Sequence, residues 1–161
     1  MRRSSFADMS CSIAQSLEIL GEWWTLLIIR DAFLGITRFE DFQERLGIAR
    51  NVLSARLQTL VDAGVLERHV YDESRDRADY RLTAMGRALW PVMTTLRHWG
   101  DKYLLGKGNE PVLARHETCG SKAPAHLSCG HCGEKLDPRQ VKLLPGPALD
   151  PDVPVAPALL D

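Results

Sequence analysis

The stretch that decides the fold is residues 37–83, TRFEDFQERLGIARNVLSARLQTLVDAGVLERHVYDESRDRADYRLT. Thr37 and Glu40 have the spacing of a capping box, which predicts that a helix begins here. Apolar residues then recur at three- and four-residue intervals, so this helix has one apolar face. The residues of that face are Phe39, Phe42 and Leu46. Gly47 follows, and glycine ends helices readily because it accepts a left-handed conformation.

A second helix is expected near 49–63, because leucines recur at helical spacing up to a stop at Gly64. Its buried face is predicted to hold Leu53, Leu57, Leu60 and Val61. Two alternating strands follow, and each is expected to bury one face. The buried positions are Leu66, Val70, Ala78, Tyr80 and Leu82. Charged residues 72–77 lie between the strands, so the order predicts a mainly α winged helix-turn-helix with this loop as its wing.

The polar side of the second helix is expected to read DNA bases. Asn51, Ala55 and Gln58 lie opposite the leucine face when residues advance by about 100° each. Arg50 and Ser54 lie nearer its edges, at the amino end that enters the major groove first. Asparagine bonds to adenine, arginine to guanine, and an alanine methyl contacts a thymine methyl. The pattern therefore favours double-stranded DNA as the partner.

Further arginines are expected to contact the DNA backbone. Arg75 and Arg77 on the wing suit phosphate or minor-groove contact, and Arg38, next to Thr37 at the expected start of the first helix, is also counted among the DNA-binding residues. Arg56 has two interpretations, a phosphate contact or an ion pair with an acidic residue of the first helix, Glu40 or Asp41. The alternative for the whole set is an ordinary solvated surface of a helical domain.

Apolar residues at helical spacing also flank the winged domain. They are Ile13, Leu17, Leu20, Trp24, Leu27, Ile28, Leu89, Val92, Met93, Leu96, Trp99, Tyr103 and Leu104, with a bend expected at Pro91. A second copy of the chain would bury such faces, and two-fold symmetry would place two recognition helices about 34 Å apart. A homodimer is therefore predicted; the alternative is that these residues only complete the monomer's own core.

Several short motifs, in the right order and spacing over residues 11–105, resemble the HxlR-type family of winged-helix transcription regulators, relatives of the MarR type. The motifs are Cys11-Ser12-Ile13, Ile19-Leu20-Gly21-Glu22-Trp23-Trp24, Arg30-Asp31-Ala32-Phe33, Arg38-Phe39-Glu40-Asp41-Phe42, Leu53-Ser54-Ala55-Arg56-Leu57, Gly64-Val65-Leu66, Tyr80-Arg81-Leu82-Thr83-Ala84-Met85-Gly86-Arg87 and His98-Trp99. The resemblance implies a homodimer that binds a palindromic operator and controls nearby genes. Ala49 departs from the pattern, since a serine or threonine would usually cap the recognition helix.

Two short segments have the spacing of metal ligands. His116 and Cys119, and Cys129 and Cys132, stand three residues apart, and a glycine follows each pair directly. One imidazole and three thiolates would make a closed, tetrahedral, structural Zn²⁺ site. The alternatives are a redox pair of Cys129 and Cys132, or reduced cysteines in a small sheet that folds unaided.

Cys11 stands at the start of the first expected helix. A helix amino terminus favours the thiolate anion, and some relatives in the resembled family sense oxidants through an amino-terminal cysteine. Oxidant sensing by Cys11 is therefore a hypothesis, and a small side chain with no redox role is the alternative. A small-molecule effector is a second hypothesis, with an apolar pocket formed by aromatic residues. Those residues are Trp24, Phe33, Trp90 and Trp99.

Composition bounds the organisation of the chain. Its 161 residues, 45% of them hydrophobic, suit one domain with an appendage, and the formal net charge of −1 neither favours nor excludes DNA binding. We expect a DNA-binding and dimerisation domain over 1–107, a small β segment containing Cys and His over 108–144, and a proline-rich tail over 145–161. The sequence contains neither an apolar run long enough for a bilayer nor a secretory signal, so a cytoplasmic protein without membrane contact is expected.

Three common enzyme motifs are absent from the sequence. It contains no glycine-rich phosphate loop, no Gly-x-Ser-x-Gly and no His-Glu-x-x-His, so we do not expect an enzyme. Two other functions remain as alternatives. One is a thiol oxidoreductase that uses Cys129 and Cys132, and the other is a winged helix that binds a protein instead of DNA.

Overall fold

The computed structural model describes residues 5–123, 126–142, 144, 146 and 147. Its elements are, in chain order, α1 (Ser12–Leu20), α2 (Thr25–Phe33), α3 (Phe39–Leu46), α4 (Arg50–Asp62), β1 (Leu66–Asp72), η1 (Glu73–Arg75), β2 (Arg77–Leu82), α5 (Ala84–Arg87), α6 (Trp90–Gly100), the π-helix η2 (Asp101–Leu105) and η3 (Pro138–Gln140). The two strands form an antiparallel sheet.

The chain divides into two compact units, 1–93 and 94–161. The domain boundaries predicted at 107 and 144 stay predictions, and most of the expected tail lies outside the described residues.

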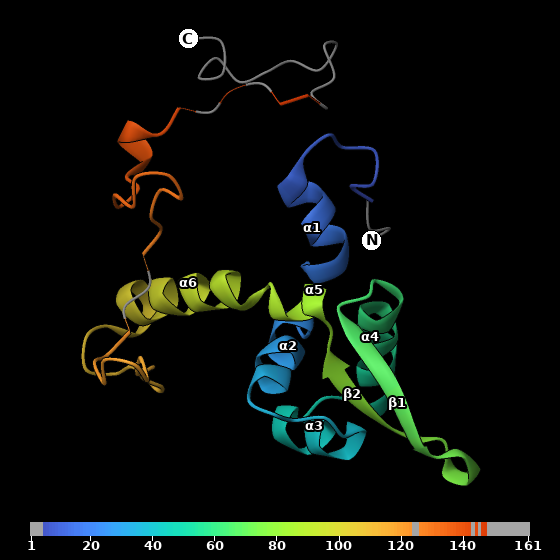
Figure 1. Ribbon diagram of the computed structural model, residues 1–161. Helices are drawn as coiled ribbons and strands as arrows, with labels where there is room; N and C mark the ends of the chain where they lie inside the picture. Colours follow the sequence, from blue (N-terminus) through green and yellow to red (C-terminus); the bar gives the residue numbers. More distant parts are fainter. Residues whose placement is uncertain (1–4, 124–125, 143, 145, 148–161) are drawn as a thin grey trace. The chain divides into compact units, whose positions relative to one another are not determined.

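The core of the first unit lies where α2, α3 and α4 meet the start of β1. The fully buried apolar side chains are Ile28, Ile29, Phe42, Leu53, Leu57, Leu60, Val65 and Leu66. The expected leucine face of α4 is therefore confirmed, although Val61 is only half buried. In Figure 1, α4 lies behind β1, while α2 and α3 lie beside β2. Burying each such side chain contributes about 1.5–3 kcal/mol, which holds α4 in place with its opposite side toward solvent.

The turn between α3 and α4 has the predicted glycine, but the start of α3 differs from the prediction. Gly47 has φ 62°, the left-handed conformation that ends α3. The capping box of Thr37 and Glu40 is wrong, because α3 begins at Phe39 after the extended residue Arg38. The Thr37 hydroxyl instead donates to the Asp79 carboxylate at 3.4 Å, and the Thr37 carbonyl accepts the Tyr80 N–H at 2.7 Å. Pairing with β2 holds this segment extended, so its hydroxyl does not cap the helix.

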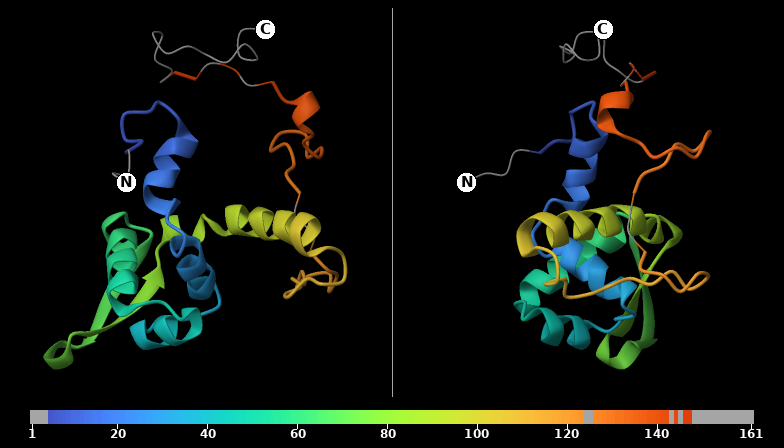
Figure 2. Two further views of the ribbon diagram at one scale, coloured as in Figure 1. Left: turned by 180° about the vertical axis from the view of Figure 1, so that it is seen from behind. Right: turned by 90° about the vertical axis from the view of Figure 1, so that its left-hand side faces the viewer.

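The hairpin of β1 and β2 forms the predicted wing. Its register runs from Leu66 opposite Leu82 to Asp72 opposite Arg77. At the tip, the Asp72 carboxylate accepts the Ser74 hydroxyl at 2.7 Å and the Arg75 N–H at 3.3 Å, and these bonds lower the pKa of Asp72. The left view of Figure 2 shows the hairpin projecting from the helices. Val70, expected to be buried, is 45% exposed because it lies on this projecting part.

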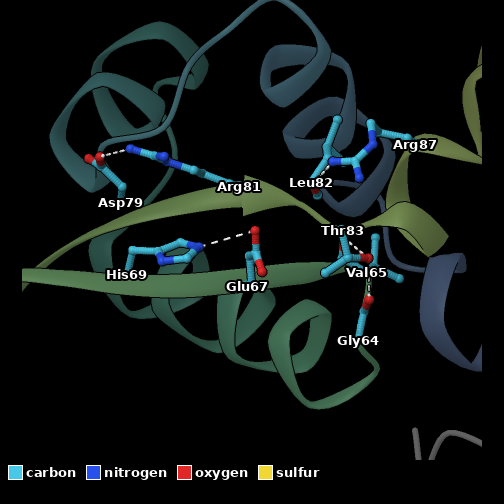
Figure 3. A network of polar contacts seen from close by, with 9 residues as sticks. All are labelled: Gly64, Val65, Glu67, His69, Asp79, Arg81, Leu82, Thr83 and Arg87. Carbon is cyan, nitrogen blue, oxygen red and sulfur yellow. Dashed lines mark hydrogen bonds and ion pairs between the residues drawn. The ribbon is translucent and has the colours of Figure 1, made fainter.

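The base of the wing is fixed by a corner around Thr83 (Figure 3). The Thr83 hydroxyl donates to the Gly64 carbonyl at 2.6 Å and accepts the Gly86 N–H at 3.0 Å, which caps α5. Arg87 donates to the Leu82 carbonyl at 2.6 Å. These bonds join the end of α4, the end of β2 and the start of α5, so the hairpin leaves the core in one direction.

The flanking helices carry exposed apolar residues. On α1, Ile13 is 73% exposed, and Trp23 before α2 is 91% exposed. The predicted bend at Pro91 is wrong: this proline lies in the first turn of α6, where its missing N–H needs no partner within the helix. It therefore separates α5 from α6 instead of bending one long helix. Within the described residues, no helix is both long and apolar enough to span a bilayer.

Candidate nucleic-acid interface

A groove of about 320 Å³ lies between α4 and the hairpin. Its lining residues are Phe39, Glu40, Arg50, Ser54, Gln58, Arg68, Asp76, Arg77, Ala78 and Tyr80. Four of the predicted DNA-binding residues are thus brought together, from two elements that are far apart in sequence. Three arginines face two carboxylates in this lining, so the groove carries a positive excess although the whole chain has a formal charge of −1. A local positive charge beside a polar helix suits a phosphate backbone.

The polar face of α4 is open to solvent. Arg50, Asn51, Ser54, Ala55 and Gln58 are all exposed, as expected for residues opposite the leucine face. Asn51 and Ala55 lie on this face outside the groove lining. The Gln58 amide donates to the Asp62 carboxylate at 2.7 Å, so its side chain must exchange that bond for any contact with a base.

The amino end of α4 combines a positioned cation with an uncapped helix. The Arg50 guanidinium carbon lies 4.8 Å from the centre of the Phe39 ring, a cation–π distance that orients it at the groove. The N-cap residue is Ala49, which supplies no capping side chain. Because alanine cannot cap the helix, N–H groups in the first turn of α4 have no side-chain partner at the cap. Such N–H groups suit a phosphate oxygen.

Arg68 is a groove residue that the sequence analysis missed. It lies on the same strand face as Leu66 and forms an ion pair with Asp76 at the wing tip. Hydrogen bonds to Asp76 and then to Tyr80 raise the pKa of Arg68 above its usual range. The sequence did contain an indication of this role. Arg68 interrupts the apolar side of an alternating strand, between Leu66 and Val70, where the hairpin leaves the core.

The remaining predicted arginines lie outside the groove lining. Arg38 is 3.9 Å from the Asp79 carboxylate and 5.3 Å from the centre of the Tyr71 ring. Arg75 is exposed at the wing tip, as expected. Arg56 forms an ion pair at 3.8 Å with Glu22, so the pairing with Glu40 or Asp41 is wrong. Glu22 precedes α2, and its approach to α4 depends on the tertiary packing.

His116 and three of the four cysteines form two separate pairs. His116 Nδ1 lies 3.3 Å from Cys119 Sγ. In the other pair, backbone N–H groups of Cys132 and His131 lower the pKa of the Cys129 thiol. Among the described residues, no three His, Cys, Asp or Glu side chains are grouped as metal ligands, so the two pairs do not meet in this structure. Cys11 is exposed and is the N-cap residue of α1.

The aromatic residues expected around an effector do not all meet. Phe33 and Trp90 line a hollow of about 510 Å³ in the first unit, beside Tyr80 and Arg87. Trp24 instead packs against the core cluster. Trp99, in the second unit, lies 6.0 Å from Tyr103 between ring centres.

The fold and the exposed face of α4 define a class of protein, the winged helix-turn-helix regulators that bind DNA. Comparison with known proteins gives the family: residues 19–107 match the HxlR-like helix-turn-helix family, and the chain belongs to it. It is 45% identical over 136 residues to an uncharacterised HTH-type transcriptional regulator of Mycobacterium tuberculosis, covering 84% of this chain and 86% of that protein. The relatives named in this comparison are transcriptional regulators, and none of their names describes an enzyme.

Solved structures agree with the family. The structure of PA1607, described as a transcription factor, has a TM-score of 0.76 and 36% identity, covering 87% of this chain and 98% of that one. The structure of PA1374 from Pseudomonas aeruginosa, also described as a transcription factor, has a TM-score of 0.63 and 35% identity, covering 88% and 96%. The predicted fold class and family are therefore confirmed, and the chain is a transcriptional regulator with a helix-turn-helix DNA-binding domain.

Proposed function

We propose that this regulator binds a palindromic operator as a homodimer and reads base edges with the polar face of α4. The observation that carries the proposal is the exposed polar face of α4 beside a groove lined by Arg50, Arg68 and Arg77. The diameter of an α-helix matches the width of the major groove, and the amino end of α4 would enter first.

Each part of the surface has a separate task in this proposal. Asn51 and Ala55 contact base edges, because they occupy the most outward side of α4. The amino-terminal amides of α4 and the wing arginines contact phosphates, which set the register of the protein on the duplex. Arg56, paired with Glu22, supports the packing of α4 instead of contacting DNA.

The homodimer is proposed from the apolar residues that the single chain leaves exposed. Ile13 and Leu17 on α1 are 73% and 40% exposed, and Leu96 and Trp99 on α6 are 47% and 53% exposed. A second copy would cover such residues, and its two-fold axis would relate two recognition helices. An operator with two matching halves follows from that symmetry.

Two mechanisms could regulate the proposed dimer, binding of a small effector or oxidation of Cys11. A small apolar effector would enter the hollow beside Phe33 and Trp90. Oxidation of Cys11 is the other mechanism, and it is favoured by the exposed position of this thiol at the start of α1. Replacement of Cys11 by serine would abolish a response of operator binding to peroxide, and an unchanged response would exclude this residue as the sensor.

Selection of bound fragments from a random DNA pool tests the proposal directly. We expect a two-fold symmetric consensus for the full chain and a loss of base preference for Asn51→Ala. Binding must also weaken steeply as salt rises, because counterions are released from phosphates. Enrichment without any preferred sequence would contradict base reading, and no retention of DNA at low salt would favour a protein partner instead. The cytoplasmic localisation stays a prediction.

A further inference from the structure

Two turns in the second unit have the same backbone hydrogen bonds. We call residues 114–123 the first turn and residues 127–136 the second turn; corresponding residues lie thirteen positions apart. The bonds of the first turn are His116 N–H to Ser121 O at 2.8 Å, Gly120 N–H to His116 O at 2.7 Å and Ala123 N–H to Ala114 O at 2.9 Å. The bonds of the second turn are Cys129 N–H to Glu134 O at 2.8 Å, Gly133 N–H to Cys129 O at 2.9 Å and Leu136 N–H to Leu127 O at 2.9 Å.

A glycine in the left-handed conformation closes each turn. Gly120 has φ 70° and Gly133 has φ 76°. This conformation reverses the chain directly after the second member of each His/Cys or Cys/Cys pair. Because both turns share one backbone geometry, each places two potential ligands, three residues apart, on the same turn.

The side chains of each pair approach each other. His116 Nδ1 and Cys119 Sγ are 3.3 Å apart, close to the separation of two ligands on one metal ion. In the second turn, the Cys129 thiol accepts the backbone N–H groups of Cys132 and His131, and its side chain also bonds to that of Cys132. Amides directed at a sulfur compensate the negative charge of a bound thiolate.

The segment that contains the turns has no apolar core of its own. Among its described residues between 112 and 142, none is fully buried. Its larger apolar side chains are all substantially exposed: Val112, Leu113, Leu127, Leu136 and Val141. So small a unit needs another source of stability, and a structural metal ion is one such source.

We propose that His116, Cys119, Cys129 and Cys132 bind one structural Zn²⁺ per chain, which brings the two turns together. Nine residues separate Cys119 from Cys129, enough chain for the second pair to reach the ion held by the first. The three thiols release their protons on binding, and neutral His116 supplies a nitrogen. Four protein ligands close the tetrahedron, so no position remains for a catalytic water. The site goes beyond the proposed DNA-binding function and does not depend on it.

The test uses the full chain, purified under reducing conditions. We expect one zinc per chain by elemental analysis. X-ray absorption at the zinc edge should show three sulfurs at about 2.3 Å and one nitrogen at about 2.0 Å. Cys119→Ser and Cys132→Ser, made separately, should each lose most of the zinc, because one alters each turn. Cys11→Ser is the matched control and should keep all of it.

A second measurement covers variants that disturb the local fold. Limited proteolysis should cut residues 112–142 readily after a chelator is added, and returning Zn²⁺ should restore protection. Circular dichroism should keep the helix signal of the first unit throughout. A zinc-free chain in the presence of excess Zn²⁺, or zinc retained equally by Cys119→Ser, would overturn the proposal. Recovery of a Cys129–Cys132 disulfide under the same conditions would also overturn it and would favour the redox pair.

Discussion

Gly86 occupies a place in which a side chain has no room. A Cβ built there would lie 2.2 Å from the Val65 carbonyl oxygen and 2.9 Å from Leu82 Cδ2. Because a backbone atom is the nearest neighbour, the contact cannot be relieved by a rotamer change. We expect Gly86→Ala to lower the free energy of unfolding by about 1–3 kcal/mol, as overpacking does, measured by urea denaturation.

Gly100 provides the matched control for this prediction. It ends α6, and a Cβ there would meet no described atom within 4 Å. Gly100→Ala should leave stability unchanged or raise it by up to about 1 kcal/mol, through helix propensity. Equal effects of the two substitutions would show that packing at Gly86 is not the cause.

Asp31 is a fully buried carboxylate between two partly exposed arginines. Its oxygens lie 2.8 Å from Arg30 Nε and 3.4 Å from Arg45 Nε. In Asp31→Ala both guanidinium groups remain partly hydrated, so the expected destabilisation is about 1.5–3 kcal/mol, the value of charged hydrogen bonds. Arg45→Ala should cost less, because Arg30 still pairs with the carboxylate. Thermal unfolding of the two variants compares these effects, and a larger loss for Arg45→Ala would contradict this account.

Individual side-chain partners were the least predictable feature from the sequence. Thr37 was expected to cap α3, but its hydroxyl bonds to Asp79, 42 residues away. Arg56 likewise pairs with Glu22, which local spacing does not indicate. Such contacts depend on where strands and helices are packed, whereas spacing rules describe only neighbours along the chain.

The hairpin and α4 form opposite walls of one groove, so their substitutions should have different signatures. Arg77→Ala removes a wing cation and should weaken binding to all duplexes alike, with a salt slope lower in magnitude by about 1. Asn51→Ala should cost about 1–3 kcal/mol on the preferred operator only. Fluorescence anisotropy across a salt series separates the two effects. Arg139→Ala, in the second unit and paired with Asp137 at 2.8 Å, is the control.

Whole helices and strands were predicted far better than the contacts of individual side chains. The leucine face of α4, the stop at Gly47 and the charged wing tip each follow from a local pattern, and the structure has all three. The exposure of Val70 was missed because strand alternation does not show where a hairpin leaves its core. Pro91 was misread for a related reason: spacing alone does not separate a bend from a new helix start.

For the molecule as a whole, the proposed dimer gives a further prediction. Ile13→Glu places a charge on a residue that is 73% exposed in the single chain. If a second copy covers it, the charge must be desolvated and the dimer should dissociate, which analytical ultracentrifugation measures. Affinity for a full operator should fall while binding to a half-site is retained. Ser12→Glu, at an exposed α1 residue about 100° around the helix from Ile13, is the control, and a dimer that survives Ile13→Glu would remove Ile13 from the interface.

Organisation at this scale was only partly accessible from the sequence. The family match over residues 19–107 supports one DNA-binding region, as the pattern of helices and strands indicated. The repeated His/Cys and Cys/Cys spacing singled out two segments, and the structure forms each of them into a turn with the same backbone hydrogen bonds. It could not predict whether the turns meet, because that depends on a bound ion or on packing that spacing does not encode.

The carboxylate of Asp76 has a consequence for how this regulator searches a genome. It forms an ion pair with Arg68 at the groove, so the Arg68 charge is partly neutralised before DNA binds. We therefore expect Arg68 to add little to non-specific binding of DNA phosphates. Weak non-specific binding to chromosomal DNA leaves more molecules of the regulator free to bind the operator. Asp76→Asn removes this negative charge. It should therefore increase the affinity for unrelated DNA and lower the ratio of operator affinity to non-specific affinity.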